Sequence, residues 1–524
     1  MANAEPVFTR PNITRDPKNM EYCQRMDALF ATLQAIKRAI PADVHRLDAI
    51  ECLLSNLEIF AVGQFEYFNL RFLNGDSAPD GCSNEQALSR IIVQISADVD
   101  VIKRALQDRA IGSEQIMHGL LPEQQALGKA YVETLDFADK LAYQSLKPAV
   151  DGNMFPDRQP TVLTYFQKDI SIRMIPYASI ALIGIPFSCM RLPQYLALQQ
   201  KKKRGSPEPV VSVAQDFMAI PHEMGHYLYW NGTPKLTRDL INALSIPLED
   251  DVLTELAKAP SPIANYQLLQ AALATPGFTA KGYAIKWSEE IFADIYGCLI
   301  AGPYISKSAQ DRQITGRSRP ELLEDDGHHP LPAVRPQLFV DTLKSQLVNE
   351  YEWSEAFRKQ WRERRRKRGV DDSDQFIIRD SATAASVVDA QLELPRIEYK
   401  AYELLEFLKL TSNDIAPSNF WRKVCQEVSG QPNLIDELYV KLATSIETIK
   451  DYLDPPPANC PPANWDDIKA HWLEQDRRLQ ILIGGTATAR EAADREWQVI
   501  LSAGGWADEE PPTSPPKGDS DPKI

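Results

Sequence analysis

Residues 222–226 read His-Glu-Met-Gly-His, and this stretch decides what the surrounding chain must build. Two histidines four positions apart lie on one face of a helix, close enough to bind a single metal ion. Glu223 is turned by about 100° from His222, so its carboxylate can lie beside such an ion without binding it. The sequence therefore predicts a helix with a metal-binding face, and this arrangement favours zinc.

The helix that carries this motif has an apolar back. Its hydrophobic side chains opposite the two histidines are Phe217, Ile220, Met224, Tyr227 and Leu228. This pattern is typical of a helix that packs on a core and turns its other face to a cleft, rather than of a structural helix with two buried histidines. The breakers at 231–234 end the helix, which begins either near Pro221 or near Asp216 with a kink at the proline.

A second polar pair lies downstream, in a predicted helix that includes residues 287–297 and ends at Ala301-Gly302-Pro303. Glu290 and Asp294 are four positions apart and so share one face. Because a catalytic zinc needs three protein ligands, we expect Glu290 to be the third. Asp294 would accept a hydrogen bond from the second ring nitrogen of a ligand histidine. Glu289 is the rival ligand, although it has no carboxylate four positions further on.

Small residues lie where the two predicted helices would meet. Gly225 stands beside the metal-binding face of the first helix, while Ala293 and Gly297 flank the polar face of the second. Without large side chains the two backbones can approach closely. The sequence therefore predicts that the two helices pack directly against each other.

The two motifs together, His222-Glu223-Met224-Gly225-His226 and Glu290-Ile291-Phe292-Ala293-Asp294, resemble the gluzincin class of zinc metallopeptidases. That class has HExxH followed downstream by ExxxD, and the resemblance covers these two helices only. It implies a zincin-like catalytic region with a Zn²⁺ cofactor, in which Glu223 activates a zinc-bound water. The longer HExxHxxGxxH pattern of the metzincins is absent, because no histidine follows Asn231 and Gly232.

A histidine- and proline-rich segment at 325–335 offers further polar groups for a cleft. Peptide hydrolysis needs a donor for the developing oxyanion in addition to the base Glu223. His329 or Arg335 could reach that oxyanion or a substrate carboxylate, and the pattern does not distinguish His328 from His329. An exposed proline-rich loop with incidental charges is the alternative interpretation.

The stretch 172–186 is rich in β-branched residues and is interrupted by prolines, which predicts two short strands. Proline within a strand indicates the edge of a sheet. An edge next to the metal would bind an extended peptide by strand addition. An ordinary core strand is an equally good interpretation.

The predicted fold class is mainly α with a small β-sheet (α+β). Helical periodicity before the catalytic region covers 21–40, 42–72, 85–108 and 122–146. The expected organisation is an extended N-terminal segment (1–20), a helical bundle (21–150), a zincin-like catalytic domain (151–345), a helical region (346–453), a proline-rich linker with a short helical unit (454–507) and a disordered acidic tail (508–524).

Composition sets the broad class. The 524 residues carry a net charge of −15, which makes nucleic acid an improbable main partner despite basic runs at 201–204 and 362–368; these are more typical of a solvated surface. We expect no signal peptide and no membrane span. The seven cysteines show no CxxC spacing, which fits free thiols in a reducing, cytoplasmic compartment.

The sequence therefore predicts a zinc metallopeptidase acting on a peptide or protein substrate. Its helical flanks would restrict access to the cleft or bind a protein partner. Two alternatives stay open. One is a non-proteolytic zinc-binding scaffold that keeps the site as a remnant, and the other is a zinc hydrolase of a non-peptide amide.

Overall fold

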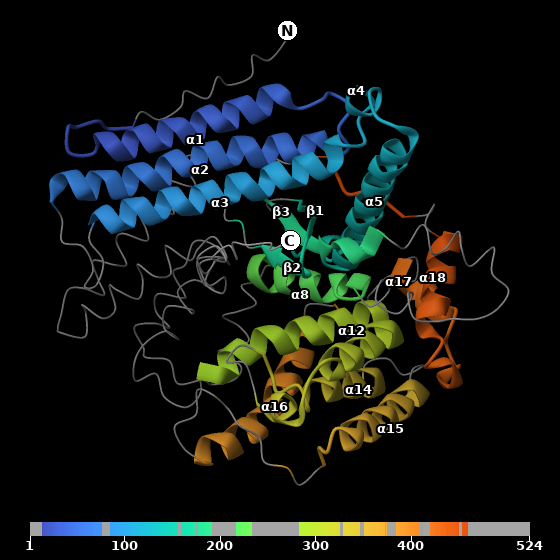
Figure 1. Ribbon diagram of the computed structural model, residues 1–524. Helices are drawn as coiled ribbons and strands as arrows, with labels where there is room; N and C mark the ends of the chain where they lie inside the picture. The colour runs from blue at the N-terminus through green and yellow to red at the C-terminus, as the bar shows by residue number, and fades with distance from the viewer. Residues whose placement is uncertain are drawn as a thin grey trace, which may run out of the picture.

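A computed structural model gives the arrangement of the chain (Figure 1). It describes residues 13–458 except 76–83, 156–158, 174, 176, 191–215, 233–281, 325–328, 346–350, 372–373, 375–383, 408–409, 411–419 and 450–452. The described chain is mostly helical with one small mixed sheet, so the predicted fold class is confirmed. The proposed tail and most of the proline-rich linker lie outside the described residues.

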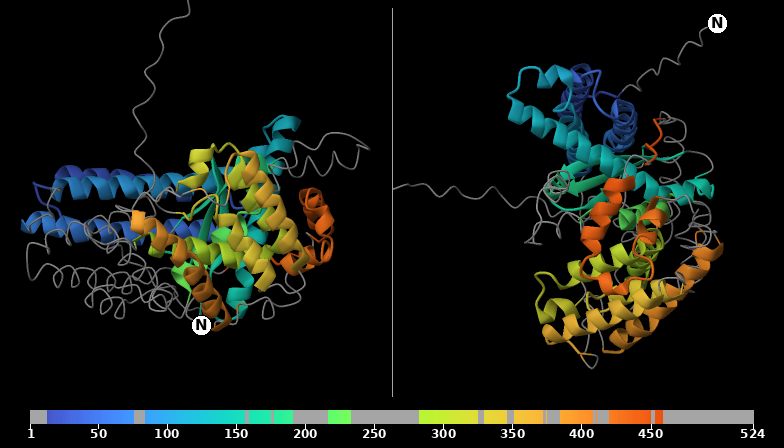
Figure 2. Two further views of the ribbon diagram at one scale, coloured as in Figure 1. Left: turned by 90° about the horizontal axis from the view of Figure 1, so that it is seen from below. Right: turned by 90° about the vertical axis from the view of Figure 1, so that its right-hand side faces the viewer.

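Three long helices form the N-terminal layer: α1 (Met20–Ala39), α2 (Leu47–Asn74) and α3 (Asn84–Ala110). They lie side by side and extend beyond the sheet (Figures 1 and 2). A short helix, α4 (Glu114–Met117), leads to α5 (Pro122–Asp151). The predicted helices are all present, but α2 begins five residues later than expected, because Arg46 before it adopts a left-handed conformation with φ 60°.

The sheet has strands β1 (Thr161–Gln167), β2 (Ser171–Arg173) and β3 (Ile180–Pro186) in the order β1-β3-β2. β1 pairs with β3 in parallel and β2 pairs with β3 antiparallel, so β2 is an edge strand. Two strands over 172–186 were predicted, and they are confirmed as β2 and β3.

The alternation of side chains along β1 assigns the two faces of the sheet to two different cores. Leu163 and Tyr165 pack into the core shared with α1–α3, whereas Val162 and Phe166 pack into a second core. A buried ion pair also fixes the layers, because Arg109 of α3 contacts Asp139 of α5 at 2.8 Å.

The second core is built by the helices that lie on the other side of the sheet (Figure 1). Beside the 3-10 turns η1 (Phe187–Met190) and η3 (Pro432–Leu434), these elements are α8 (Ile220–Asn231), α12 (Gly282–Ile314), α14 (Arg335–Ser345), α15 (Tyr351–Lys367), α16 (Ala384–Phe407), α17 (Phe420–Gln426) and α18 (Leu438–Ile449). Helix α5 also places its buried residues in this core. The short helix α13 (Arg319–Leu323) packs instead in a small third cluster with Trp361 of α15.

The helix carrying Glu290 was predicted to end at 301–303, and Gly302 does leave the helical conformation there, with φ 51° and ψ −127°. A second helix follows at once and continues to Ile314, which was not predicted, so that α12 consists of two helical halves joined at a kink. Both halves are packed in the core.

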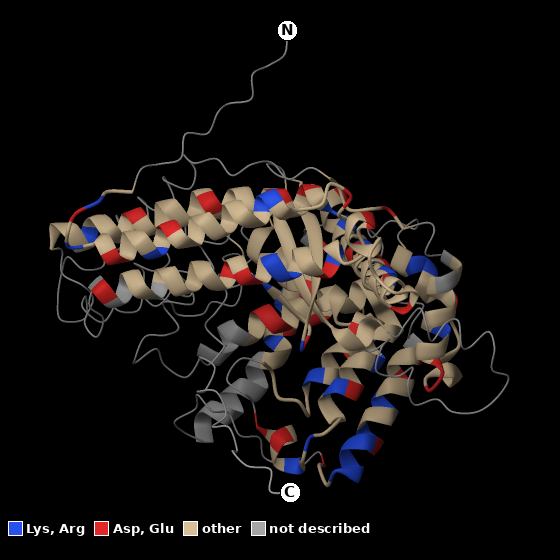
Figure 3. Ribbon diagram, turned by 45° about the horizontal axis from the view of Figure 1, so that its top comes forward, with Lys and Arg blue, Asp and Glu red and all other residues tan. Residues whose placement is uncertain are grey.

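Two sequence expectations concern the thiols and the surface. Cys23, Cys189, Cys298 and Cys425 are free, but Cys52 is disulfide-bonded, so the expectation of free thiols throughout was wrong. Among the helices that the structure describes, none combines the length and apolar character needed to span a bilayer. Charges of both signs cover the surface, and the last turn of α15 carries the basic run around 364–367 (Figure 3).

Candidate metal centre

Helix α8 presents the two histidines as the sequence predicted. It begins at Ile220 with Pro221 in its first turn, close to the first of the two predicted starts. Asp216 and Phe217 are also helical, and a turn at 218–219 separates them from α8. The backbone N–H of Gly232 closes the helix by donating to the Leu228 carbonyl over 2.7 Å. The five residues of the predicted apolar back face are all buried in the second core.

Small residues bring α8 and α12 into direct contact, as predicted. A Cβ atom on Gly225 would lie only 2.6 Å from Ala293 Cα, and one on Gly297 would lie 3.2 Å from the backbone nitrogen of His222. The two backbones therefore touch at the level of the histidines. This close approach lets side chains from both helices meet around one point.

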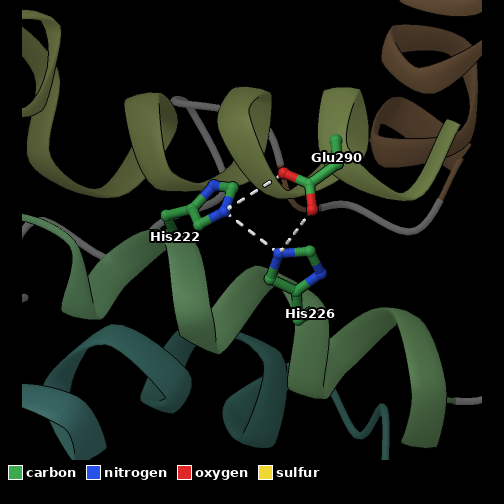
Figure 4. A group of neighbouring side chains, drawn as sticks. All are labelled: His222, His226 and Glu290. Carbon is green, nitrogen blue, oxygen red and sulfur yellow. Dashed lines mark hydrogen bonds and ion pairs between the residues drawn. The ribbon is translucent and has the colours of Figure 1, made fainter. Parts of the chain in front are cut away.

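The three predicted ligands do meet at that point (Figure 4). His222 Nε2 and His226 Nε2 are 3.0 Å apart. The two oxygens of Glu290 each lie 3.5 Å from one of these nitrogens. One ligand atom from each of the three residues lies within 4.8 Å of the other two. Among the residues that the structure describes, this is the cluster of His, Cys, Asp and Glu side chains that could hold a metal ion. Two imidazole nitrogens and one carboxylate are a donor set that suits zinc.

A separate carboxylate lies behind each histidine. Asp294 Oδ1 is 2.9 Å from His222 Nδ1, so the carboxylate lies beside the predicted ring nitrogen, although the angles are not those of a hydrogen bond. Glu289 Oε1 is 2.9 Å from His226 Nδ1, so the rival ligand is instead placed to orient the second histidine. Sequence reasoning missed this role. The contact arises because the two helices pack antiparallel, which brings the residues before Asp294 opposite His226.

Trp230 is a further neighbour that the sequence did not point out. Its indole Nε1–H donates to Glu289 Oε1 over 2.8 Å. Its ring also stacks on the His226 ring, with centroids 5.6 Å apart. Trp230 follows His226 by one helical turn, so both side chains lie on the same face of α8.

Two of the predicted groups reach the site from the start of α14 and from the segment just before it. Arg335 Nη2 donates to Glu290 Oε2 over 2.8 Å, and its Nε donates to Asp294 Oδ2 over 2.7 Å. His329 Nε2 lies 3.3 Å from Glu290 Oε1 and its side chain is 43% exposed. His328 lies outside the described residues. Of the two donors, His329 is therefore the accessible one, while Arg335 is engaged with both carboxylates.

Glu223 lies beside the ligands and reaches the sheet. Its Oε2 accepts a hydrogen bond from the backbone N–H of Ile172 over 3.0 Å. Because Ile172 belongs to β2, the edge strand runs next to the metal centre. Among the described residues, the first of the two predicted strands therefore lies at the sheet edge, whereas the second, β3, is the central strand.

Electrostatics favour ionised carboxylates in the centre. Burial opposes the charged form of His226, but Glu290 and Glu289 outweigh it and raise the pKa of the imidazole to about 9. Burial likewise opposes ionisation of Glu290, yet His226 and Arg335 hold the pKa of its carboxyl well below the usual range. Arg335 and His222 lower the pKa of buried Asp294 in the same way. The centre thus has the negative charge that a cation requires.

Comparison of the chain with protein-family models, with curated proteins and with solved structures finds no match. The geometry of the site therefore carries the functional argument by itself.

Proposed function

We propose that the protein is a zinc-dependent hydrolase of peptide bonds. The observation that carries this proposal is the convergence of His222, His226 and Glu290 to within 4.8 Å, with Glu223 beside them. A structural zinc site normally closes its coordination with four protein ligands, whereas a catalytic one uses three and a carboxylate base. Three ligand groups with a carboxylate beside them are the composition of the second kind, and this supports the proposal.

His222, His226 and Glu290 would hold the metal, and Asp294 and Glu289 would fix the orientation of the two imidazoles. A zinc ion held there would act as a Lewis acid, polarising a carbonyl group and making a water molecule more acidic. The carboxylate behind each ring leaves Nε2 as the nitrogen that faces the metal.

Glu223 would serve as the general base and then as the general acid. It takes a proton from the attacking water, whose oxygen bonds to the carbonyl carbon. It then returns that proton to the amine as the C–N bond breaks. The hydrogen bond from Ile172 holds one carboxylate oxygen, so the other is available for the transfer.

His329 is the better placed of the two predicted oxyanion donors, because its side chain is partly exposed next to Glu290. Arg335 would instead balance the charge of Glu290 and Asp294. The edge strand supports a peptide as the substrate, since an extended chain can add to a sheet edge with main-chain hydrogen bonds.

The test is to incubate the purified protein with peptide pools and identify products by mass spectrometry. We expect about one zinc per chain and cleavage that stops on addition of a chelator. Glu223→Gln should retain the zinc and lose activity by roughly 10²- to 10⁴-fold. Glu133→Gln, an exposed substitution of the same type on α5, should behave like the unmodified protein.

Different outcomes of this test support different functions. Zinc binding without cleavage in any pool would favour the non-proteolytic scaffold. If no peptide is cleaved but a non-peptide amide releases its amine in a chelator-sensitive reaction, the zinc hydrolase of a non-peptide amide would be favoured. Absence of metal after gentle purification, with none taken up on reconstitution, would contradict all three.

A further inference from the structure

We propose that Glu289 and Trp230 form a positioning pair that strengthens metal binding through His226, an inference that rests on the metal site of the proposed function. Glu289 contacts the ligand histidine at Nδ1, the ring nitrogen other than the one that faces Glu290, and Trp230 contacts both residues. Their effect would be exerted on the position and electron donation of the His226 ring.

The two carboxylates behind the histidines differ in how their charge is balanced. Asp294 shares its charge with Arg335, which donates to it from both Nε and Nη2. In the described chain, Glu289 has as partners His226 and the uncharged indole of Trp230. Within the part of the chain that the structure describes, the histidine is thus the one ionisable partner of this carboxylate. A ring that donates to an uncompensated carboxylate is the more basic ligand.

Trp230 keeps the Glu289 carboxylate in place. Its indole is buried, it stacks on the His226 ring at an interplanar angle of 29°, and its Nε1–H reaches the same Oε1 that faces His226 Nδ1. Two donors converging on one oxygen leave the carboxylate a single orientation. The indole also covers the His226–Glu289 contact with apolar surface, which strengthens the interaction by lowering the local dielectric.

Two substitutions separate charge from packing. Glu289→Gln keeps an oxygen that can accept from both donors but removes the charge, whereas Trp230→Phe keeps the stacked ring but removes the donor. Neighbouring residues offer matched controls, because the Tyr229 hydroxyl and Ser288 Oγ form a 3.1 Å hydrogen bond with each other between the same two helices. These controls are Tyr229→Phe and Ser288→Ala.

The measurement is zinc affinity by competition with a chromophoric chelator, with thermal unfolding to verify folding. We expect Glu289→Gln to weaken zinc binding by about 10- to 100-fold and Trp230→Phe to weaken it by a smaller factor. Both controls should bind zinc as the unmodified protein does. If Glu289→Gln proves unstable, the comparison of Trp230→Phe with Tyr229→Phe decides.

Two results would overturn the inference: unchanged affinity in the folded Glu289→Gln variant, or an equal loss in the controls, which would mean that only helix packing matters. The proposed function is tested separately, by peptide cleavage. A protein that binds zinc but cleaves no peptide removes that function and leaves this inference intact, because affinity is its readout.

Discussion

The backbone N–H of Ile172 donates to Glu223 Oε2 over 3.0 Å, which ties the edge strand of the sheet to the proposed general base. Successive residues of a strand point their hydrogen-bonding groups to opposite sides. The Ile172 N–H therefore faces away from β3, on the side open to the metal centre. The contact sets the position of the carboxylate from outside its own helix.

Replacing Ile172 with proline should remove this donor at small cost to the sheet, because proline is tolerated at a free strand edge. A lost hydrogen bond to a charged group costs about 1.5 to 3 kcal/mol, so we expect turnover to fall by roughly 10- to 100-fold. Zinc affinity should stay the same, since no ligand is touched. Steady-state kinetics together with a zinc titration measure both effects.

Ile172→Val is the control for this substitution, because it keeps the N–H and changes only the side chain. It should retain nearly full turnover. Equal activity of the proline and valine variants would show that the Ile172 donor is not needed to position Glu223.

Arg335→Met should destabilise the folded protein. The guanidinium is the positive partner of two buried carboxylates, Glu290 and Asp294. Removing one side of a buried ion pair commonly costs about 3 to 5 kcal/mol. Urea unfolding should show a loss of this size, and added zinc should restore part of it because the ion supplies positive charge. Lys344→Met, an exposed substitution on the same helix, should have little effect. A stable Arg335→Met protein would mean that other groups balance the carboxylates.

Features that depend on local sequence were predictable. The spacing of His222 and His226 and the pair Glu290 and Asp294 each define one helix face, and both faces were found to meet. Gly225 and its small neighbours on the other helix indicated how closely the faces approach. These predictions needed only helix periodicity and side-chain size.

Features that depend on the angle between distant elements were not predictable. The contact of Glu289 with His226 requires a particular register between two helices, and the two residues lie 63 positions apart along the chain. Whether the chain resumes a helix after Gly302 depends on the elements that pack against the two halves of α12. Neither follows from propensity, because the deciding partner is set by the tertiary fold.

Gly225→Ala tests the close approach of the two helices. The added Cβ would lie 2.6 Å from Ala293 Cα and 3.0 Å from the Ala293 carbonyl oxygen. These are backbone atoms, so the clash cannot be relieved by a change of side-chain rotamer. Overpacking of this kind costs about 1 to 3 kcal/mol, more than the gain of up to about 1 kcal/mol in helix propensity. We expect a lower midpoint in urea and weaker zinc binding.

Gly297→Ala is the comparison for the glycine test. Its Cβ would first meet the flexible end of Ile305, at 2.8 Å, and then backbone atoms of His222 at 3.2 and 3.3 Å, so the helices would have to separate less than at Gly225. We expect a smaller loss than for Gly225→Ala. If the two variants were equally stable, backbone contact at Ala293 would not be what limits the helix separation.

A buried acid far from the metal ligands predicts how stability depends on pH. Burial is the main cause that raises the pKa of Glu398 to about 7, while a hydrogen bond from Tyr402 opposes the shift and Asp341 adds to it. The Tyr402 hydroxyl donates to Glu398 Oε1 over 2.6 Å and also lies 2.9 Å from Thr342 Oγ1, so this group links α16 to α14.

The sign follows from proton binding. Between the ordinary pKa of 4.5 and about 7, the folded protein keeps a proton that the unfolded chain has released, so the stability contributed by this group falls as pH rises through that window. Glu398→Gln mimics the protonated acid and still accepts from Tyr402. At pH 8 it should exceed the unmodified protein in free energy of unfolding by about 2 to 3 kcal/mol. Near pH 4.5 the two should differ by less than about 1 kcal/mol.

Urea unfolding at both pH values measures this difference, and Glu406→Gln, an exposed substitution on the same helix, serves as the control. The control should show no comparable gain at pH 8, because an exposed carboxylate keeps its hydration when it ionises. A gain of equal size at both pH values for Glu398→Gln would point to packing rather than to a proton. A loss at pH 8 would mean that the ionised carboxylate is the form that the Tyr402 hydroxyl stabilises.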